Sequence, residues 1–360
     1  MEAYTSHDWM VFWSYGSFFL ALLCSFRLVF NKERNTSTVP YFPYQFNYIL
    51  LVLIAIYFAL EPIVMYSDKW NYEMIFNSIV TGTTHLMNTE SGFYFYNKLI
   101  SFISNSSFFY FFITALIYLL GSLNFINKVF TLSNRYIVFV VMISSLGFYN
   151  YGTNTIRQGL ALAVFLFVFS EVKINLKVVL ISALAILLHK SLLILVGMNF
   201  IIKVYNRKDN FISVWIIFLL FSLAFGNAFV NTFGSFLMDS DQRMVSYLND
   251  TFENYQSGFR LDFLIYSMIP IMFGWVVKKR GFKDVLYDKI FSLYVLVNAI
   301  WLLVITLPFT DRFAYLSWFL IPFVFMYPLS KKFLFRNQNF FIAGIVMFLA
   351  TINLIISTKS

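Results

Sequence analysis

The sequence contains few charged residues and almost no cysteine. Only 12% of its 360 residues are charged and 60% are hydrophobic, so a soluble domain could not cover its own surface. Cys24 is the only cysteine, which excludes an internal disulfide, a CxxC motif and a thiolate metal site. Four signatures of soluble enzymes are also missing: GxGxxG, the Walker loop, HExxH and a serine-centred nucleophile elbow. These absences leave the lipid bilayer as the main solvent of the fold.

Long apolar runs take the place of these motifs. They approach or exceed the roughly 18 residues typical of a transmembrane helix. The first run has no basic residue before it, unlike a signal peptide, so we expect it to be retained. The sequence therefore predicts an all-α, polytopic transmembrane helix bundle that forms a single domain over residues 1–360. We expect spans at 9–29, 47–66, 106–126, 136–150, 155–171, 212–234, 261–277, 287–308, 313–330 and 339–357.

The net charge of +9 comes from short basic clusters between the apolar runs. No strongly basic face or tail emerges, so nucleic acid is not an expected partner. Basic clusters mark the cytoplasmic side by the positive-inside rule, and all of these fit one orientation with the N-terminus extracytoplasmic. The clusters are Arg27, Lys32 and Arg34; Lys128 and Arg135; Lys173 and Lys177; Lys203, Arg207 and Lys208; Lys278, Lys279, Arg280 and Lys283; and Lys331, Lys332 and Arg336.

The stretch 176–202 has basic clusters of the cytoplasmic kind on both sides. One pass cannot begin and end on the same side, and two full passes need about 40 residues. A re-entrant hairpin or a pair of short helices is therefore expected, giving about eleven spans in all. Its midpoint is His189-Lys190-Ser191, and irregular backbone at membrane depth requires protein or a wet cavity around it. We place His189 at the floor of an outward-open polar cavity.

Two longer segments, 67–105 and 235–260, are expected on the extracytoplasmic side. The aromatic stretch from Gly92 to Ile103 in the first has the pattern of an interfacial amphipathic helix. Asp239-Ser240-Asp241 in the second has the spacing of a nucleotide-sugar metal motif, but no Rossmann-like unit surrounds it, so no metal site is expected. The cytoplasmic connections are too short for a nucleotide-binding domain.

Four helices that return from the outer side are predicted to begin near a cation: Arg157, Lys190, Arg260 and Arg312. A cation is unfavourable at a helix N-terminus, where the macrodipole is already positive. An anionic ligand reverses that penalty, because free N–H groups and cations together bind anions. The ordinary alternative is that these side chains reach the outer interface or pair with Asp262 and Asp311.

Three further side chains are candidates for proton transfer: Asp68, Glu90 and His189. Asp68 and Glu90 flank the outer end of a span, where a base could meet an incoming hydroxyl, although loop acids are usually only solvated. A lone histidine at membrane depth requires a reason. His189 could act as a base, donate a hydrogen bond to phosphate, or satisfy backbone carbonyls at the helix break.

These residues resemble the EpsG family, whose members include bacterial O-antigen and exopolysaccharide polymerases. The resemblance is carried by Asn154-Thr155-Ile156-Arg157-Gln158-Gly159-Leu160-Ala161 and by Ala185-Ile186-Leu187-Leu188-His189-Lys190-Ser191. Weaker matches are Tyr66-Ser67-Asp68 with Tyr72 and Phe76, Glu90-Ser91-Gly92-Phe93, and Asp311-Arg312-Phe313-Ala314-Tyr315. The resemblance covers about residues 50–330. Ser67 stands where the family pattern has Gly, and Lys190 separates the His from the Ser, which leaves open whether Lys190 or Ser191 faces the cavity.

The resemblance implies extracytoplasmic glycosyl transfer from an undecaprenyl-diphosphate-linked glycan to another lipid-linked repeat unit, in the bacterial inner membrane. Arg157 and Arg312, supported by Lys190 and Arg260, would bind diphosphate. His189, Asp68 or Glu90 would activate the acceptor or orient the sugar. We expect no cofactor and no metal, and membrane lipid and a chain-length regulator are the other partners considered. Asn154, Gln158 and Tyr315, within the matching motifs, are expected to orient the substrate.

Two other functions share this chemistry. A flippase for the same lipid-linked glycan also needs a cationic cavity, but it should expose polar residues toward both faces for alternating access. A ligase that joins finished polymer to lipid A, or a transferase that adds single sugars, shares the outward arginines, and only the motif resemblance separates it from a polymerase.

Overall fold

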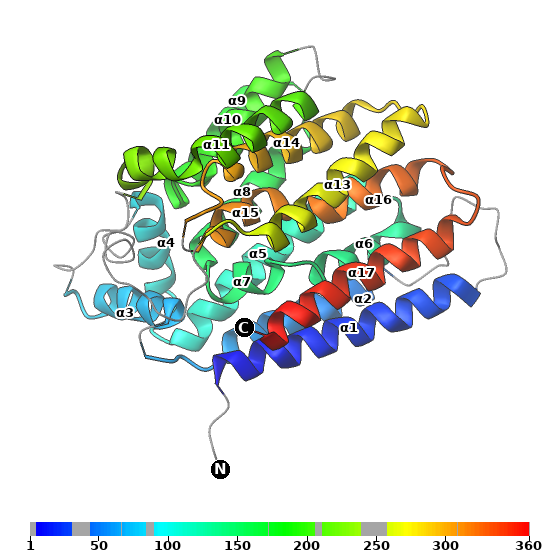
Figure 1. The fold of residues 1–360 in the computed structure, drawn as a ribbon. Helices are drawn as coiled ribbons and strands as arrows, with labels where there is room; N and C mark the ends of the chain where they lie inside the picture. The colour runs from blue at the N-terminus through cyan, green and yellow to red at the C-terminus, as the bar shows by residue number, and fades with distance from the viewer. Residues whose placement is uncertain are drawn as a thin grey trace. The chain divides into compact units, whose positions relative to one another are not determined.

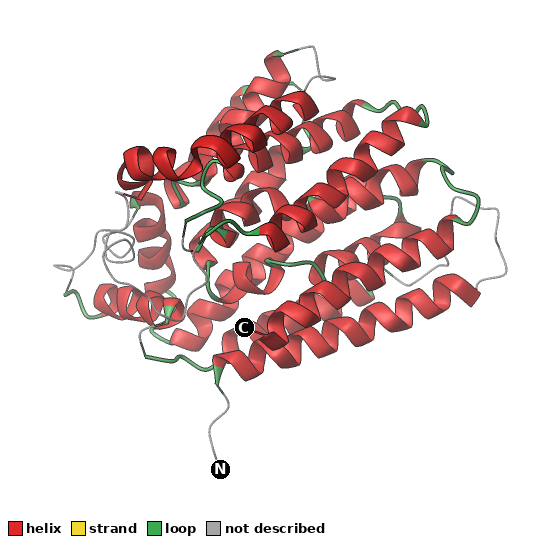
Figure 2. Ribbon diagram, viewed as in Figure 1, coloured by secondary structure: helices red, strands yellow, loops and turns green. Residues whose placement is uncertain are grey.

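The computed structural model of the protein describes residues 5–30, 44–65, 67–83, 90–171, 173–205, 211–238, 258–307 and 309–359. Every regular element in these residues is a helix, so the all-α prediction is confirmed (Figure 2). The chain divides into two compact units, which are treated separately below. The first comprises Met1–Val196 with Phe325–Ser360, and the second comprises Gly197–Val324.

Long apolar helices dominate the described residues. Six segments there are long and apolar enough to cross a membrane: α1 (Ser6–Phe30), α5 (Ser107–Val129), α13 (Leu261–Lys279), α14 (Val285–Leu302), α17 (Gln338–Lys359), and Asp311–Lys331, which contains α15 (Asp311–Trp318) and α16 (Ile321–Lys331). Shorter apolar helices are α2 (Phe46–Leu60), α6 (Leu132–Ile143), α8 (Ile156–Phe169), α9 (Leu176–Leu188), α10 (Leu192–Val204) and the first part of α11 (Phe211–Met238). This is the architecture of a multi-pass membrane protein.

The first unit is built around α5, which packs against both α2 and α8, while α8 also packs against α9. A Cβ at Gly121 would lie 2.7 Å from Ala163, so a larger residue there could not keep α5 and α8 this close. The helices α1 and α17 run antiparallel side by side (Figure 1). Ser14 bonds Ser357 at 2.7 Å and Ser25 donates to the Ala343 carbonyl at 3.3 Å, so polar contacts hold both ends of this pair.

Two predicted spans are shorter or more broken than expected, and the stretch 176–202 is broken where the sequence predicts. The run 136–150 is interrupted: α6 ends at Ile143, and α7 (Phe148–Thr153) begins after Gly147, whose φ of 82° ends the straight helix. The stretch 176–202 forms two short helices, α9 and α10, with the break at His189-Lys190-Ser191. The predicted break is confirmed, and the path of the two helices through the membrane stays a prediction. The run 47–66 stops being helical at Leu60, just before Glu61 and Pro62.

Two helices of the first unit lie outside the apolar runs. These are α3 (Asp68–Val80) and α4 (Ser91–Ser101), which pack against each other. The buried face of α4 carries Phe93 and Ile100, while Phe95 and Leu99 on its other face are exposed. The predicted amphipathic character is confirmed, and its placement in the membrane interface stays a prediction.

A buried hydrogen-bond network organises the second unit. Asn298 on α14 accepts a hydrogen bond from Trp215 Nε1 of α11 at 2.8 Å. Its amide donates to Ser267 Oγ of α13 at 3.1 Å and to Ser317 Oγ of α15 at 3.0 Å. Asn298 is fully buried, so its amide needs hydrogen-bond partners within the protein. Forming these bonds holds α11, α13, α14 and α15 in one arrangement.

Candidate functional site

The carboxylate of Glu90 joins Arg157 to His189. Glu90 Oε2 lies 2.7 Å from an Arg157 guanidinium nitrogen, and Glu90 Oε1 lies 2.9 Å from His189 Nδ1. The side chains of Glu90 and Arg157 are each 11% exposed, and that of His189 is 23% exposed. The structure therefore brings together three of the predicted site residues, which are 67 and 99 positions apart along the chain.

Each member of this cluster stands at the end of a helix. Glu90 is the N-cap residue of α4, Arg157 is the second residue of α8, and His189 is the C-cap residue of α9. Gly92 allows the first and last of these to meet, because a Cβ there would lie 2.6 Å from the carbonyl group of Leu187. The first turn of α4 is thus seated directly on the last turn of α9.

Two aromatic rings flank the Arg157 guanidinium. Its central carbon lies 5.6 Å from the Tyr72 ring and 5.9 Å from the Phe93 ring. Both rings are buried, and they meet edge to face at 5.9 Å. A guanidinium between aromatic faces keeps its charge while losing conformational freedom.

The pKa of Glu90 is set by opposing effects. Burial by itself raises the pKa, but the hydrogen bond with His189 and the positive charge of Arg157 outweigh it and hold the pKa at about 2. Glu90 is therefore ionised at neutral pH and is a poor proton acceptor. Its geometry suits a different task, that of fixing the guanidinium and the imidazole relative to each other.

The bond with Glu90 also selects a role for His189. When Nδ1–H donates to the carboxylate, the proton-accepting nitrogen of the neutral ring is Nε2. The neighbouring residues differ in placement, since Lys190 is exposed, whereas the hydroxyl of Ser191 is buried with no hydrogen-bond partner among the described residues. Between the two residues left open by the sequence, Ser191 is therefore the one whose polar group is directed into the protein.

The motif that contains Arg157 also contains Gly159, which is required by the packing of α7 against α8. A Cβ at Gly159 would collide with the Tyr151 carbonyl oxygen, so glycine lets α7 fold tightly back on α8. Asn154, at the C-cap of α7, donates to Asn150 Oδ1 at 3.2 Å, and Gln158 is buried.

A comparison with protein families identifies the family of the chain. The model of the EpsG family matches residues 45–360. The chain belongs to the EpsG family. Membership implies a membrane role of the polysaccharide-polymerase kind, and it confirms the family predicted from the sequence. No curated protein and no solved structure matches the chain.

All four cationic helix starts predicted for this EpsG-family chain are present. Beyond Arg157, Lys190 directly precedes the first turn of α10, Arg260 is the N-cap residue of α13, and Arg312 is the second residue of α15. Arg260 forms a two-point ion pair with Asp262, at 2.9 Å and 2.7 Å. This residue therefore pairs with a neighbouring acid, as the ordinary alternative to anion binding predicts. Its diphosphate-binding role stays a prediction.

The other sequence candidates are placed as follows. Arg312 lies 5.2 Å from the ring of Phe309, which has the unusual φ of 55°. Tyr315 is buried against Trp318. Asp68 is the first residue of α3, one helical turn before Tyr72 and therefore on the same face. Asp239-Ser240-Asp241 lies outside the described residues.

Sequence reasoning missed a buried ion pair. Lys69 Nζ donates to the carbonyls of Phe58 and Glu61, each at 2.8 Å, and lies 3.5 Å from the Glu61 carboxylate, which also accepts a hydrogen bond from Tyr149 at 2.8 Å. Both charged side chains are 2% exposed. Burial lowers the pKa of Lys69 to about 8, against the opposing charge of Glu61. The sequence does contain one indication of this pair: Glu61 is a carboxylate at the end of an apolar run, where an acid needs a partner.

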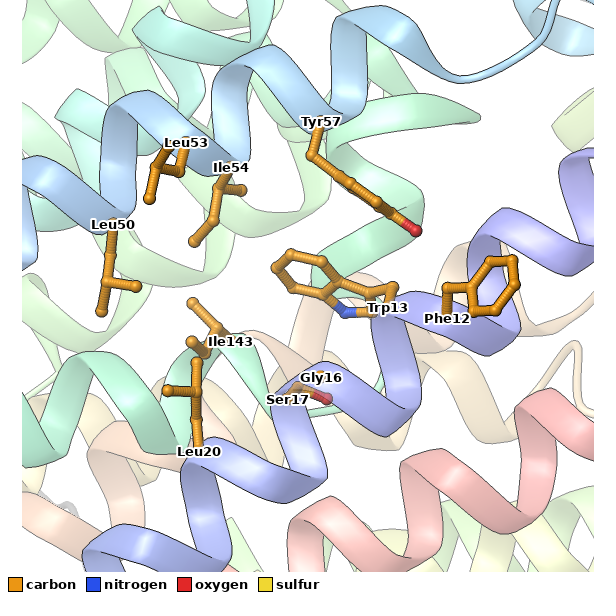
Figure 3. Close-up of a pocket in the computed structure, with 10 residues that line it drawn as sticks. All are labelled: Phe12, Trp13, Gly16, Ser17, Leu20, Leu50, Leu53, Ile54, Tyr57 and Ile143. Atoms are coloured by element: carbon orange, nitrogen blue, oxygen red, sulfur yellow. The ribbon is translucent and has the colours of Figure 1, made fainter.

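An apolar cavity of about 360 Å³ lies between α1 and α2 (Figure 3). Its walls include Trp13, Leu20, Leu53 and Ile54, and none of the residues lining it is charged. It suits a hydrocarbon chain and lacks the cations that a diphosphate requires. The reactive groups of the EpsG-family chain are therefore better sought at the Glu90, Arg157 and His189 cluster.

Proposed function

We propose that this chain is an extracytoplasmic polymerase that transfers a glycan from undecaprenyl diphosphate to a second lipid-linked repeat unit, building O-antigen or exopolysaccharide. The observation that carries the proposal is the Glu90 carboxylate shared by Arg157 and His189. Glycosyl transfer of this kind needs a cation for the leaving diphosphate and a base for the acceptor hydroxyl. The cluster supplies both within one hydrogen-bonded unit.

The step is a substitution at the anomeric carbon of the donor sugar. The acceptor hydroxyl oxygen forms the new bond to that carbon, and its proton passes to His189 Nε2. The bond between the anomeric carbon and the diphosphate oxygen breaks, and its electron pair leaves with the lipid diphosphate. Arg157 counters the charge that develops on the diphosphate, while Glu90 stabilises the imidazolium and holds both side chains in place.

The charges at the two ends of α8 support an outward-facing reaction. Arg157 stands at the start of α8, and just beyond its end Glu171 pairs with Lys128 at 2.7 Å, beside the basic residue Lys173. A helix of this length separates its ends by about 20 Å. Since basic residues favour the cytoplasmic side, the cluster falls on the extracytoplasmic side, in a bacterial inner-membrane protein of about eleven spans with its N-terminus outside.

A deletion strain complemented with wild-type or variant protein tests this function. Arg157→Ala should leave single repeat units on the lipid anchor, and Arg157→Lys should restore little polymer, because lysine lacks the guanidinium fork. Lys177→Ala, an exposed cation outside the cluster, is the matched control and should give the full ladder. Surface polysaccharide is separated on gels, and protein levels are checked by blot.

Other results for the surface polysaccharide would point to a different function. Full-length but unattached polymer in the deletion strain would identify a ligase. Loss of all surface glycan with lipid-linked repeats held at the inner face would identify a flippase. A normal ladder with Arg157→Ala would remove the cluster from the mechanism.

A further inference from the structure

A second cavity, of about 290 Å³, lies inside the second unit, between the start of α11, the end of α13 and the middle of α14. Its apolar wall includes Phe211, Trp275 and Phe291. Lys278 and Lys279 also line it. The cavity thus combines a hydrocarbon surface with two ammonium groups. This combination suits a ligand that has both an apolar part and an anionic part.

The lysines are held at the mouth of this cavity by their neighbours. Lys279 Nζ lies 3.8 Å from the centre of the half-exposed Trp275 ring, and Lys278 Nζ lies 3.2 Å from Asp288 Oδ1. The other nearby acid, Asp284, accepts hydrogen bonds from the first backbone N–H groups of α14 at 2.9 Å and so serves as its N-cap. Arg280 and Lys283 add two exposed cations in the same connection, so positive charge exceeds negative charge here.

One residue of the cavity wall carries a buried hydroxyl. Ser292 lines the cavity and is 1% exposed, yet its hydroxyl has no hydrogen-bond partner within the described part of the chain. Leaving a buried hydroxyl unsatisfied is unfavourable. A ligand oxygen seated between Ser292 and the two lysines would remove that cost.

We propose that this cavity binds an anionic phospholipid, whose phosphate meets Lys278, Lys279 and Ser292 and whose acyl chain lies on Phe211 and Phe291. The cavity stands at the basic end of the candidate membrane span α13 and beside the middle of a second candidate span, α14. Basic pockets between transmembrane helices are suited to anionic headgroups, and an indole at the same level is typical of the membrane interface. The site is separate from the glycosyl-transfer chemistry, so its lipid would stabilise the second unit without reacting.

The test uses the full-length protein purified in mild detergent, with bound lipids extracted and identified by mass spectrometry. The wild-type protein should retain anionic phospholipid in preference to phosphatidylcholine. Lys278→Ala with Lys279→Ala should reduce that retention roughly 30-fold, at about 1 kcal/mol for each lysine. Arg280→Ala with Lys283→Ala removes the same charge just outside the cavity and should retain the lipid.

Ser292→Ala keeps the packing and tests the hydroxyl if the lysine variant folds poorly; it should also retain less anionic lipid. Thermal stability is then measured in vesicles of phosphatidylcholine with and without phosphatidylglycerol, and in detergent with inorganic phosphate. Stabilisation by phosphatidylglycerol alone supports the proposal. Equal stabilisation by inorganic phosphate, equal loss of lipid in the two double variants, or undiminished retention in Ser292→Ala would overturn it.

Discussion

At the scale of single residues, Glu90 matters because it contacts two functional groups at once. A carboxylate that binds a guanidinium through one oxygen and an imidazole through the other fixes their separation without taking part in proton transfer. The low pKa of Glu90 fits that task, since the group stays charged throughout the physiological range. The same carboxylate fixes the tautomer of His189 and confines the guanidinium of Arg157.

Glu90→Gln preserves the shape of the side chain and removes its charge. We expect polymer formation to fall by at least about tenfold, because Arg157 loses its ion pair and His189 loses the partner that stabilises its charged form. Glu171→Gln is the matched control, since it removes a carboxylate from the more exposed pair with Lys128, where the expected effect is small. Equal activity in the two variants, at equal protein levels, would exclude an orienting role for Glu90.

The pH dependence of stability follows from the lowered pKa of Glu90. Its pKa in the folded protein, about 2, lies below its ordinary value of 4.5, so ionisation favours the folded state. This contribution is fully present above about pH 4.5 and is lost as the pH falls toward 2. The stability difference between wild type and Glu90→Gln should therefore shrink as the pH falls from about 4.5 toward 2. A difference that stays unchanged over that acidic range would contradict this assignment.

At the scale of helices, close approach between backbones positions the cluster. The Gly92 contact seats α4 on the end of α9, and the Gly159 contact folds α7 against α8. The Gly92 approach accompanies the pairing of Glu90 with His189, 99 positions away along the chain. The apolar core determines that helices form, while these small residues determine how closely their ends meet.

Gly92→Ala tests this positioning directly. A Cβ at position 92 would lie 2.6 Å from the Leu187 carbonyl group, so α4 must move away from α9 and carry Glu90 away from His189. We expect polymer formation to fall severalfold with most of the protein still folded in the membrane. Gly344→Ala on α17, where a new Cβ meets nothing within 4 Å, should leave polymer length unchanged. Normal polymer with Gly92→Ala would show that the close approach is not required.

Much of this helical order was predictable from the sequence. Apolar runs identified nearly every long helix, and the polar tripeptide at 189–191 identified the break between α9 and α10. The interruption after Ile143 was missed, because Ser144, Ser145 and Gly147 sit inside an apolar stretch and hydropathy alone passes over them. Local turn chemistry, rather than hydrophobicity, decided that element.

The pairing within the site could not be predicted in the same way. The three residues were expected to be functional for different reasons: Arg157 as a cation at a helix start, Glu90 as an acid near the outer end of a span, and His189 as a lone histidine at membrane depth. Which oxygen meets which nitrogen depends on the packing of α4, α8 and α9, which no local pattern encodes. The Lys69 and Glu61 pair was missed for a related reason, since a lysine in an outer helix is usually solvated.

At the scale of the whole molecule, the topology can be tested with cysteine labelling. The single native cysteine, Cys24, is buried, so new cysteines can be labelled against a low background. Lys190→Cys should react with a membrane-impermeant maleimide added from the extracytoplasmic side, because residue 190 is exposed at the break between α9 and α10 and the proposed topology turns that break outward. Lys128→Cys should react only after the inner membrane is permeabilised. The reverse pattern would place the cluster on the cytoplasmic side and exclude extracytoplasmic polymerisation.

The most direct test of the central claim is glycosyl transfer by the purified protein in liposomes that contain undecaprenyl-diphosphate-linked repeat units. With the wild-type protein, the glycan should lengthen and free lipid diphosphate should appear in step with each new glycosidic bond, whereas His189→Ala should bind the donor and produce neither. Movement of the lipid-linked donor across the bilayer without chain growth, or undiminished chain growth by His189→Ala, would contradict the account.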